Sequence, residues 1–281
     1  MDRTPSIPKS PSNPRANAAK VGLWGVPWDI QSSFRRGAAD APARIRQWFY
    51  SDAGNLCTEV GPDLSSDRRW RDLGDLSIDN RESDLDDIEM AAGALLNQGL
   101  RLVSLGGDHA VTYPLIRAYS GHYPDLNILQ IDAHPDLYDS FNENRLSHAC
   151  PFARIMEEGL AAGLIQVGIR TAVPHQREQA RRFGVSMVEM RQLGPDRLPA
   201  IAAPVYLSLD LDALDPAYAP GVSHPEPGGL STREAIAMIQ NLSGKLVGAD
   251  IVEYNPQCDV NDLTARVAAK LAKEAIAALL G

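Results

Sequence analysis

The chain has 281 residues, a formal charge of −9 and a sequence pI near 5.1. Nucleic-acid phosphates are bound by clustered Lys and Arg, so this acidic balance argues against a nucleic-acid-binding protein. No apolar run approaches the roughly 20 residues of a membrane-spanning helix, which argues against a membrane protein. A soluble enzyme with a small cationic substrate fits the composition better.

Residues 1–20 are rich in Pro, Ser, Asn and Arg and contain little to bury. We predict a disordered tail for 1–20 and one folded domain for 21–281, with a degenerate transit peptide as the alternative for the tail. The stretch lacks the apolar centre of a secretory signal. Cys57, Cys150 and Cys258 show no CxxC spacing, which is typical of free thiols in a reducing compartment, so we predict a cytoplasmic location.

Short apolar runs predict β-strands along the chain. They are VGLWGV from residue 21, RLVSLG from 101, LNILQID from 126, LIQVGIR from 164, PVYLSLD from 204 and LVGADIVE from 246. Runs that are apolar on both faces are typical of a mainly parallel sheet covered by helices on both sides. We therefore predict a single-domain α/β fold.

Apolar residues at helical spacing predict helices between and after these strands. One set comprises Leu85, Ile88, Ala92, Leu95 and Leu96, and the last comprises Leu263, Val267, Leu271, Ile276 and Leu279. Ser231 followed by Glu234 has the spacing of a capping box, which predicts the start of a further helix.

Acidic and histidine residues directly follow four of the predicted strands. They lie in GGDH at 106–109, DAHPD at 132–136, SLDLDALDP at 208–216 and at Glu253. Ligands of an open parallel sheet bind outside the carboxyl ends of its strands, so we expect these segments to form one site. Gly106 and Gly107 indicate a close approach of two backbone segments there.

The alternation of Asp132, His134 and Asp136 directs three side chains to the same side of an extended backbone, and Asp210 and Asp212 have the same spacing. The candidate metal ligands are His109, Asp132, His134, Asp136, Asp210 and Asp212. This set exceeds the needs of one ion. An oxygen and nitrogen set without thiolate favours two Mn²⁺, with Ni²⁺, Co²⁺ or Fe²⁺ as alternatives.

Two ions about 3.5–4 Å apart can share a water, lower its pKa and present hydroxide to an electrophilic carbon, which predicts a hydrolase. We assign Asp132 and Asp210 as the bridging carboxylates. His109 and Asp136 would complete the surroundings of one ion, and His134 and Asp212 those of the other.

In this order, GGDH, DAHPD, SLDLDALDP and GADIVEYNP resemble the motifs of the ureohydrolase family of arginases and agmatinases from Val21 onward. The stretches DAHPDLYDSFNENRLSHACPFARIM, YAPGVSHPEPGGLS and GADIVEYNPQCD are similar to plant-type arginases. The resemblance implies an arginase-type α/β fold, a binuclear manganese centre on the same six ligands, and a homotrimer or homohexamer. It also implies hydrolysis of a small guanidino compound to urea and an amine.

The resemblance also implies roles outside the metal shell. Glu253 would accept hydrogen bonds from the planar guanidinium of the substrate. His148 would give a proton to the departing amine, with helix capping as its alternative role. Asp136 would hold a metal and accept a hydrogen bond from the hydroxide. His224, in a Pro- and Gly-rich loop, is a candidate for the pocket mouth.

The loop LYDSFNENRLSH between Asp136 and His148 departs from the familiar animal arginase pattern, which leaves the substrate open. Its hydrogen-bond donors suit a carboxylate, and they are Asn142, Asn144, Arg145 and Ser147. Because agmatine would leave such donors unpaired, we predict L-arginine over agmatine, with solvated or inter-subunit side chains as the alternative. Guanidinobutyrate, guanidine and substituted guanidines are the other candidates.

Two other functions are compatible with part of the pattern. A single-zinc deacetylase-like amidohydrolase also uses a DxH string and a later Asp, but it does not need a second set of ligands. A non-catalytic guanidine-binding subunit could retain the fold without turnover. The amount of metal bound per chain tests the first alternative, and a urea assay tests the second.

Overall fold

The computed structural model describes residues 19–194 and 200–281. The strands form one eight-stranded sheet in the order β2-β1-β3-β8-β7-β4-β5-β6, and all pairings are parallel. They are β1 (Val21–Gly25), β2 (Trp70–Asp75), β3 (Arg101–Leu105), β4 (Asn127–Ile131), β5 (Gly163–Ile169), β6 (Ser186–Glu189), β7 (Val205–Asp210) and β8 (Leu246–Val252). Residues 1–18 of the expected tail lie outside the described part, so the boundary after residue 20 stays a prediction.

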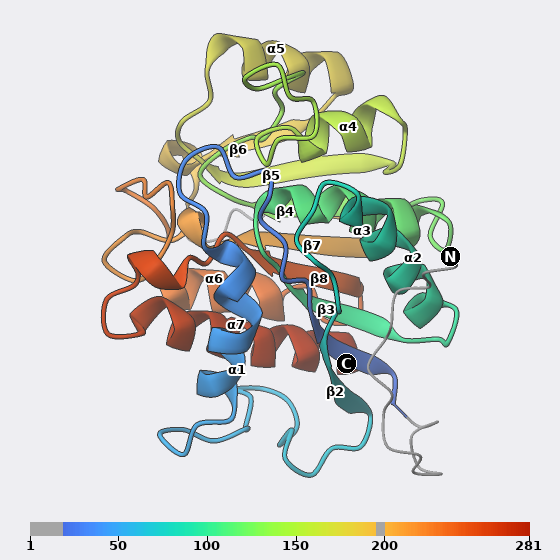
Figure 1. Cartoon of the computed structure of the whole chain (residues 1–281), viewed down its shortest axis with the longest axis vertical. Coiled ribbons are helices and arrows are strands. Elements are labelled where there is room, and N and C mark those ends of the chain that lie inside the picture. The colour runs from blue at the N-terminus through green and yellow to red at the C-terminus, as the bar shows by residue number, and fades with distance from the viewer. Residues whose placement is uncertain (1–18, 195–199) are drawn as a thin grey trace.

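Helices cover both faces of the sheet (Figure 1). One layer consists of α1 (Ala41–Phe49), α6 (Thr232–Gln240) and α7 (Leu263–Leu280). The other consists of α2 (Asp84–Leu96), α3 (Thr112–Ser120), α4 (Pro151–Glu157) and α5 (Pro174–Phe183). The predicted α/β fold with helices on both faces of a parallel sheet is therefore confirmed.

The apolar runs form strands because each sheet face lies against a hydrophobic core. In β7, Val205, Leu207 and Leu209 point into the core below α1, α6 and α7, whereas Tyr206 points into the core of the other layer. Every residue of β7 is buried. The two edge strands, β2 and β6, were not among the predicted runs, because charged residues interrupt WRDLGD, SMVE has only two apolar residues, and both strands are only partly buried.

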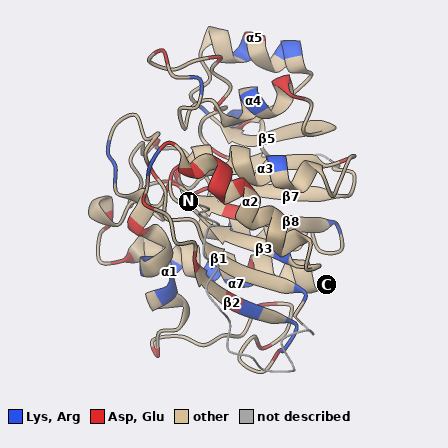
Figure 2. Cartoon of the chain, turned by 45° about the vertical axis from the view of Figure 1, so that its right-hand side comes forward, with Lys and Arg blue, Asp and Glu red and all other residues tan. Residues whose placement is uncertain are grey.

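The helix starts follow local chemistry. The Ser231 Oγ accepts from the Glu234 backbone N–H at 3.2 Å, and the Glu234 carboxylate accepts from the Ser231 N–H at 2.8 Å, which confirms the predicted capping box. Acidic residues in the first turn of α2, red in Figure 2, suit the positive end of the helix dipole. No helix in the described part of the chain is long and apolar enough to span a bilayer.

The four strands that precede the acidic and histidine segments, β3, β8, β7 and β4, are consecutive neighbours in the sheet. Since all are parallel, their carboxyl ends lie at one edge. Gly107 fits tightly at this edge: a Cβ on it would lie 1.7 Å from the Trp28 carbonyl oxygen, so only glycine allows this approach. The topology thus places the four segments side by side.

Candidate metal centre

The six candidate ligands form two adjoining groups at the carboxyl edge of the sheet. The first group comprises His109, Asp132, Asp136 and Asp210, and the second comprises Asp132, His134 and Asp212. Within each group, one ligand atom from every residue lies within 4.8 Å of the others. Asp132 belongs to both groups, as expected of a bridging carboxylate. Asp210, the other expected bridge, appears only in the first.

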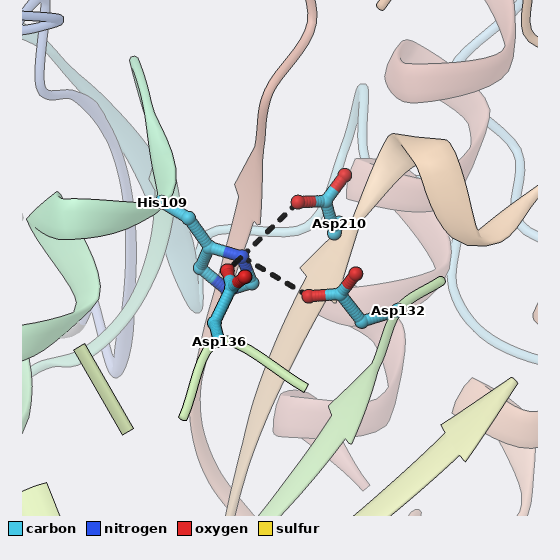
Figure 3. Close-up of side chains that lie close together, drawn as sticks. All are labelled: His109, Asp132, Asp136 and Asp210. Carbon is cyan, nitrogen blue, oxygen red and sulfur yellow. Dashed lines mark ion pairs between the residues drawn. The ribbon is translucent and has the colours of Figure 1, made fainter. Parts of the chain in front are cut away.

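Distances within the groups show how Asp132 connects them. The His109 Nδ1 lies 3.2 Å from Asp132 Oδ2, and 3.0 Å from a carboxylate oxygen of Asp136 and of Asp210 (Figure 3). The His134 Nδ1 lies 2.9 Å from Asp212 Oδ2 and 3.7 Å from Asp132 Oδ1. Asp132 therefore directs one oxygen to each group.

Short 3₁₀ turns and unusual backbone angles position these side chains. His109 opens the turn His109–Val111, which follows β3 after residues 106–108, and Asp212 lies in the turn Leu211–Ala213 after β7. Asp136 and Glu253 adopt positive φ angles of 47° and 64°, which non-glycine residues rarely do. Backbone strain of this kind is concentrated at functional sites, because it is retained only where surrounding contacts enforce it.

The donor set fits divalent cations. His109 is fully buried, and its Nδ1 has no hydrogen-bond partner among the described residues although three carboxylate oxygens surround it. Burial opposes the charged imidazolium, yet these carboxylates raise the pKa of His109 well above its usual value. A position that attracts a proton so strongly also attracts a metal ion, which competes with that proton.

The pKa shifts of the carboxylates also indicate a site for cations. Burial, followed by the adjacent Asp212 and Asp132, raises the pKa of Asp210 well above its usual value. Burial also raises the pKa of Asp212 to about 6, against the opposing effect of His134. So many buried acids cannot all ionise without positive charge among them, and cations would supply that charge.

Ser208 and Asp250 orient His109 from behind. The Ser208 hydroxyl donates to Asp250 Oδ1 at 2.7 Å, so its oxygen accepts from the His109 Nε2–H at 2.9 Å. Asp250 also accepts from the hydroxyls of Thr112 and Tyr206. In a neutral His109 this chain of bonds leaves the Nδ1 lone pair facing the carboxylates, which is the form that binds a metal.

We expect Ser208→Ala to weaken metal binding about 10- to 100-fold, because such outer partners orient a histidine ligand. Isothermal titration of metal-stripped protein with Mn²⁺ measures this. Ser104→Ala is the matched control, since Ser104 is also a buried strand hydroxyl but accepts from Trp24 at 2.7 Å instead of contacting His109. Equal affinities of the two variants would contradict the orienting role.

His148 and Glu253 form a buried pair next to the metal-ligand groups. The His148 Nδ1 lies 2.8 Å from Glu253 Oε1, which also accepts from the His109 backbone N–H at 2.9 Å. Burial opposes a charged His148, but Glu253 raises the pKa of His148 to about 9. Burial likewise opposes ionisation of Glu253, but His148 lowers the pKa of that carboxyl, so the two form an ion pair at neutral pH.

The two groups and the pair open onto one cavity of about 160 Å³. Besides His134, Asp136, Asp210, Asp212, His148 and Glu253, its lining consists of Ser33, Tyr138, Phe141, Ala149, Thr171, Gln176 and His224. His224, the candidate residue for the pocket mouth, is among these lining residues. A larger cavity of about 210 Å³ is lined by Arg69 and Glu274 but by none of the candidate ligands.

The predicted substrate-tail residues do not line the cavity, and this expectation needs correction. The Arg145 guanidinium pairs with Asp139 at 2.8 Å and with Glu157 at 2.6 Å. Asn144 donates to the side chain of Gln31. Asn142 is exposed and Ser147 is buried away from the lining. From the same loop, Tyr138 and Phe141 line the cavity.

Comparisons with known proteins agree with this geometry. The model of the arginase family matches residues 19–278. Arginase 1, mitochondrial, of Arabidopsis thaliana is 45% identical over 273 residues, which are 91% of this chain and 80% of the relative. Agmatinase of Bacillus cereus is 34% identical over 274 residues, 94% of this chain and 93% of the relative.

Solved structures share the fold. An arginase from Medicago truncatula has a TM-score of 0.84 at 43% identity, covering 92% of this chain and 87% of its own. The agmatine ureohydrolase of Thermoplasma volcanium has a TM-score of 0.85 at 31% identity, covering 100% and 95%. Fold and site are those of a metal-dependent hydrolase. The chain belongs to the arginase family, and the predicted similarity to plant arginases is confirmed.

The expectation of a cytoplasmic location is contradicted by these relatives. Those from Arabidopsis thaliana are named mitochondrial and chloroplastic/mitochondrial, and that from Medicago truncatula is named mitochondrial. The expectation rested on three free cysteines. Free thiols indicate a reducing compartment, and they do not distinguish the cytosol from the interior of an organelle.

Proposed function

We propose that the protein hydrolyses a small guanidino compound to urea and an amine in a metal-dependent reaction. One observation supports this proposal most directly. Two metal-ligand groups that share Asp132, and the ion pair of His148 and Glu253, open onto the same cavity. Urea release from guanidino substrates, with each candidate metal added to stripped enzyme, tests the proposal. No urea with any metal would contradict it and would favour a non-catalytic guanidine-binding protein.

Two divalent ions, for which we propose Mn²⁺, would be held by the six ligands. Asp132 and Asp210 would bridge, His109 and Asp136 would complete one position, and His134 and Asp212 the other. When bound, the ions supply Lewis acidity that activates water at neutral pH. Two groups of ligands favour this arrangement over a single-zinc deacetylase-like site, and elemental analysis should find two metals per chain.

Glu253 would bind the substrate guanidinium. Both hydrogen bonds that its carboxylate accepts from the described residues, from the His109 N–H and from His148, go to Oε1. Glu253 also lines the cavity, so Oε2 can accept from the planar guanidinium. The lowered pKa of this carboxyl, caused by His148 against the effect of burial, keeps it ionised for a cationic partner.

His148 would protonate the departing amine. Its imidazole lines the cavity, and its raised pKa of about 9, which Glu253 causes against the effect of burial, keeps it protonated at neutral pH. An alkylamine leaves poorly unless it is protonated, so a proton held at this position promotes cleavage of the carbon–nitrogen bond. Asp136, at the same cavity, would accept a hydrogen bond from the attacking oxygen.

L-Arginine is our first candidate substrate, because the relatives at 45% identity are named arginases. Tyr138 and Gln176 line the cavity, and the side chain of each carries an uncharged donor of the kind that suits a carboxylate. Agmatine is the second candidate, because the same lining contains no Lys or Arg to pair with a carboxylate, and a relative at 34% identity is named agmatinase. Guanidinobutyrate and other guanidines follow.

We expect a higher kcat/KM for L-arginine than for agmatine. The cost of leaving one buried donor unpaired, about 1–3 kcal/mol, sets the size of the preference. Both constants should be measured with the same metal and at the same pH. A clear preference for agmatine would sink the arginine assignment while leaving the hydrolysis of guanidino compounds intact. We also propose a homotrimer or homohexamer, which sedimentation would distinguish.

A further inference from the structure

The imidazole of His148 is held at both nitrogens. Its Nδ1 lies 2.8 Å from Glu253 Oε1, and its Nε2 lies 2.8 Å from the hydroxyl oxygen of Ser33. His148 is buried, whereas Ser33 is exposed and also lines the cavity. The Ser33 hydroxyl therefore connects the outer ring nitrogen of His148 with solvent.

Hydrogen bonds on the inner side fix the segment that carries Ser33. Asp108, which is fully buried, accepts from the Gln31 backbone N–H at 3.0 Å and from the Ser32 hydroxyl at 3.2 Å. The His148 backbone N–H donates to the Gln31 carbonyl at 3.3 Å. The backbone beside Ser33 is thus bonded to the backbone of the residue whose ring Ser33 contacts.

Asp29 connects the two ends of the segment that carries Ser33. Its carboxylate accepts from the Arg36 guanidinium at 2.8 Å and from the Gly37 N–H at 2.7 Å. It also accepts from the Asn80 amide at 2.8 Å. Two buried carboxylates, Asp29 and Asp108, therefore hold an otherwise exposed loop in one conformation. Because its backbone is held in place, Ser33 can keep its hydroxyl at hydrogen-bonding distance from the His148 Nε2.

We propose that Ser33 is a positioning residue for His148. The Ser33 hydroxyl holds the His148 Nε2 at the cavity and returns a proton from solvent to this nitrogen. The inference rests on the proposed function, in which His148 protonates the departing amine. In the resting enzyme the Nε2–H donates to Ser33. When the amine forms, the ring exchanges this acceptor for the leaving nitrogen.

The return of the proton to His148 conserves atoms and charge. After the transfer, Nε2 has a lone pair. The Ser33 hydroxyl gives its proton to Nε2 while its oxygen takes one from a solvent acid, so one proton passes to the imidazole and the serine is unchanged. A hydroxyl suits this position because it donates and accepts at the same time.

Kinetics of Ser33→Ala, Ser33→Thr and the wild type test the proposal. Ser33→Ala should lower kcat about tenfold, the effect of one hydrogen bond to a charged partner, with unchanged KM and metal content. Ser33→Thr keeps the hydroxyl and should recover most of kcat. Ser66→Ala, which removes an exposed hydroxyl bonded to the Asp63 carbonyl, is the matched control. Unchanged kcat in Ser33→Ala, loss of metal, or a threonine variant as slow as alanine would overturn the proposal.

A spectroscopic measurement separates this proposal from the proposed function. In the full chain labelled with ¹⁵N-histidine and supplied with diamagnetic Zn²⁺, the Nε2–H of His148 should give a protected cross-peak, assigned by its loss in His148→Asn. The peak should persist in Ser33→Thr and disappear in Ser33→Ala. Its absence from the wild type, or its persistence in Ser33→Ala, would overturn the positioning role. If the wild type releases no urea, the proposed function fails, and the spectra still decide whether Ser33 holds His148.

Discussion

Replacement of Asp132 by Asn is expected to abolish urea release and to lower the metal content of the purified protein. Asp132 belongs to both ligand groups and directs one carboxylate oxygen toward His109 and the other toward His134. An amide has the shape of the carboxylate but lacks its charge, and one of its two terminal atoms is a donor that cannot bind a cation. Elemental analysis and a urea assay on the same preparation measure both effects.

Asp210→Asn should also abolish urea release and lower the metal content, because Asp210 is the second proposed bridging carboxylate and belongs to the first ligand group. Asp125→Asn is a matched control, because Asp125 is an exposed carboxylate that precedes β4, the strand that Asp132 follows. If Asp132→Asn retained two metals and near-normal turnover, the ligand assignment would be wrong.

Replacement of His148 by Asn should leave both metals in place and reduce turnover by about 10²–10⁴-fold, the usual contribution of a positioned proton donor. The side chain contacts Glu253 and Ser33 and belongs to neither ligand group, so its removal spares the metal ligands. Single-turnover kinetics with metal analysis test this. His122→Asn, at an exposed position, is the control.

Loss of metal in His148→Asn would contradict the proton-donor role and show a structural one. Glu253→Gln should differ from it, because Glu253 is proposed to bind the guanidinium as well as to support His148. That variant should raise KM in addition to lowering kcat. A change in kcat alone would remove the guanidinium-binding role from Glu253.

The interior of the fold was predictable from sequence, and its edges were not. All six predicted strands are interior strands, and the two missed, β2 and β6, are the sheet edges. An interior strand lies against a core on each face and therefore has a continuous apolar run, as in β7. An edge strand such as WRDLGD is half exposed and tolerates polar residues, so its sequence resembles that of a loop.

The acidic and histidine residues were predictable because they follow strand ends in sequence. The side chains that support these residues were not predicted, because their positions in the sequence do not set them apart. Ser208 and Asp250 lie inside apolar strand runs, and Ser33 lies far from His148 in sequence. Only the paired register of β7 with β8, in which Ser208 lies opposite Asp250, brings the first two together.

The failure at Arg145 has a different physical cause. Its charge suggested a free partner for a substrate carboxylate, but two acidic side chains, Asp139 and Glu157, already neutralise it. Buried Arg154 joins the same ion-pair cluster and donates to the Asp139 carbonyl at 2.9 Å. Composition within a loop reports which charges are present, but it does not report how they pair.

The division between strand ends and loops has a consequence for how this architecture can diversify. The metal-ligand groups and Glu253 lie at the carboxyl ends of four adjacent strands between two hydrophobic cores, whereas Tyr138, Phe141 and His224 reach the cavity from connecting segments. Insertions or exchanges in those segments leave strand packing intact, so new specificities can evolve without rebuilding the reaction centre. Directed evolution toward another amidine should therefore randomise Tyr138, Phe141 and His224 and keep the strand ends, Ser33 and His148 constant.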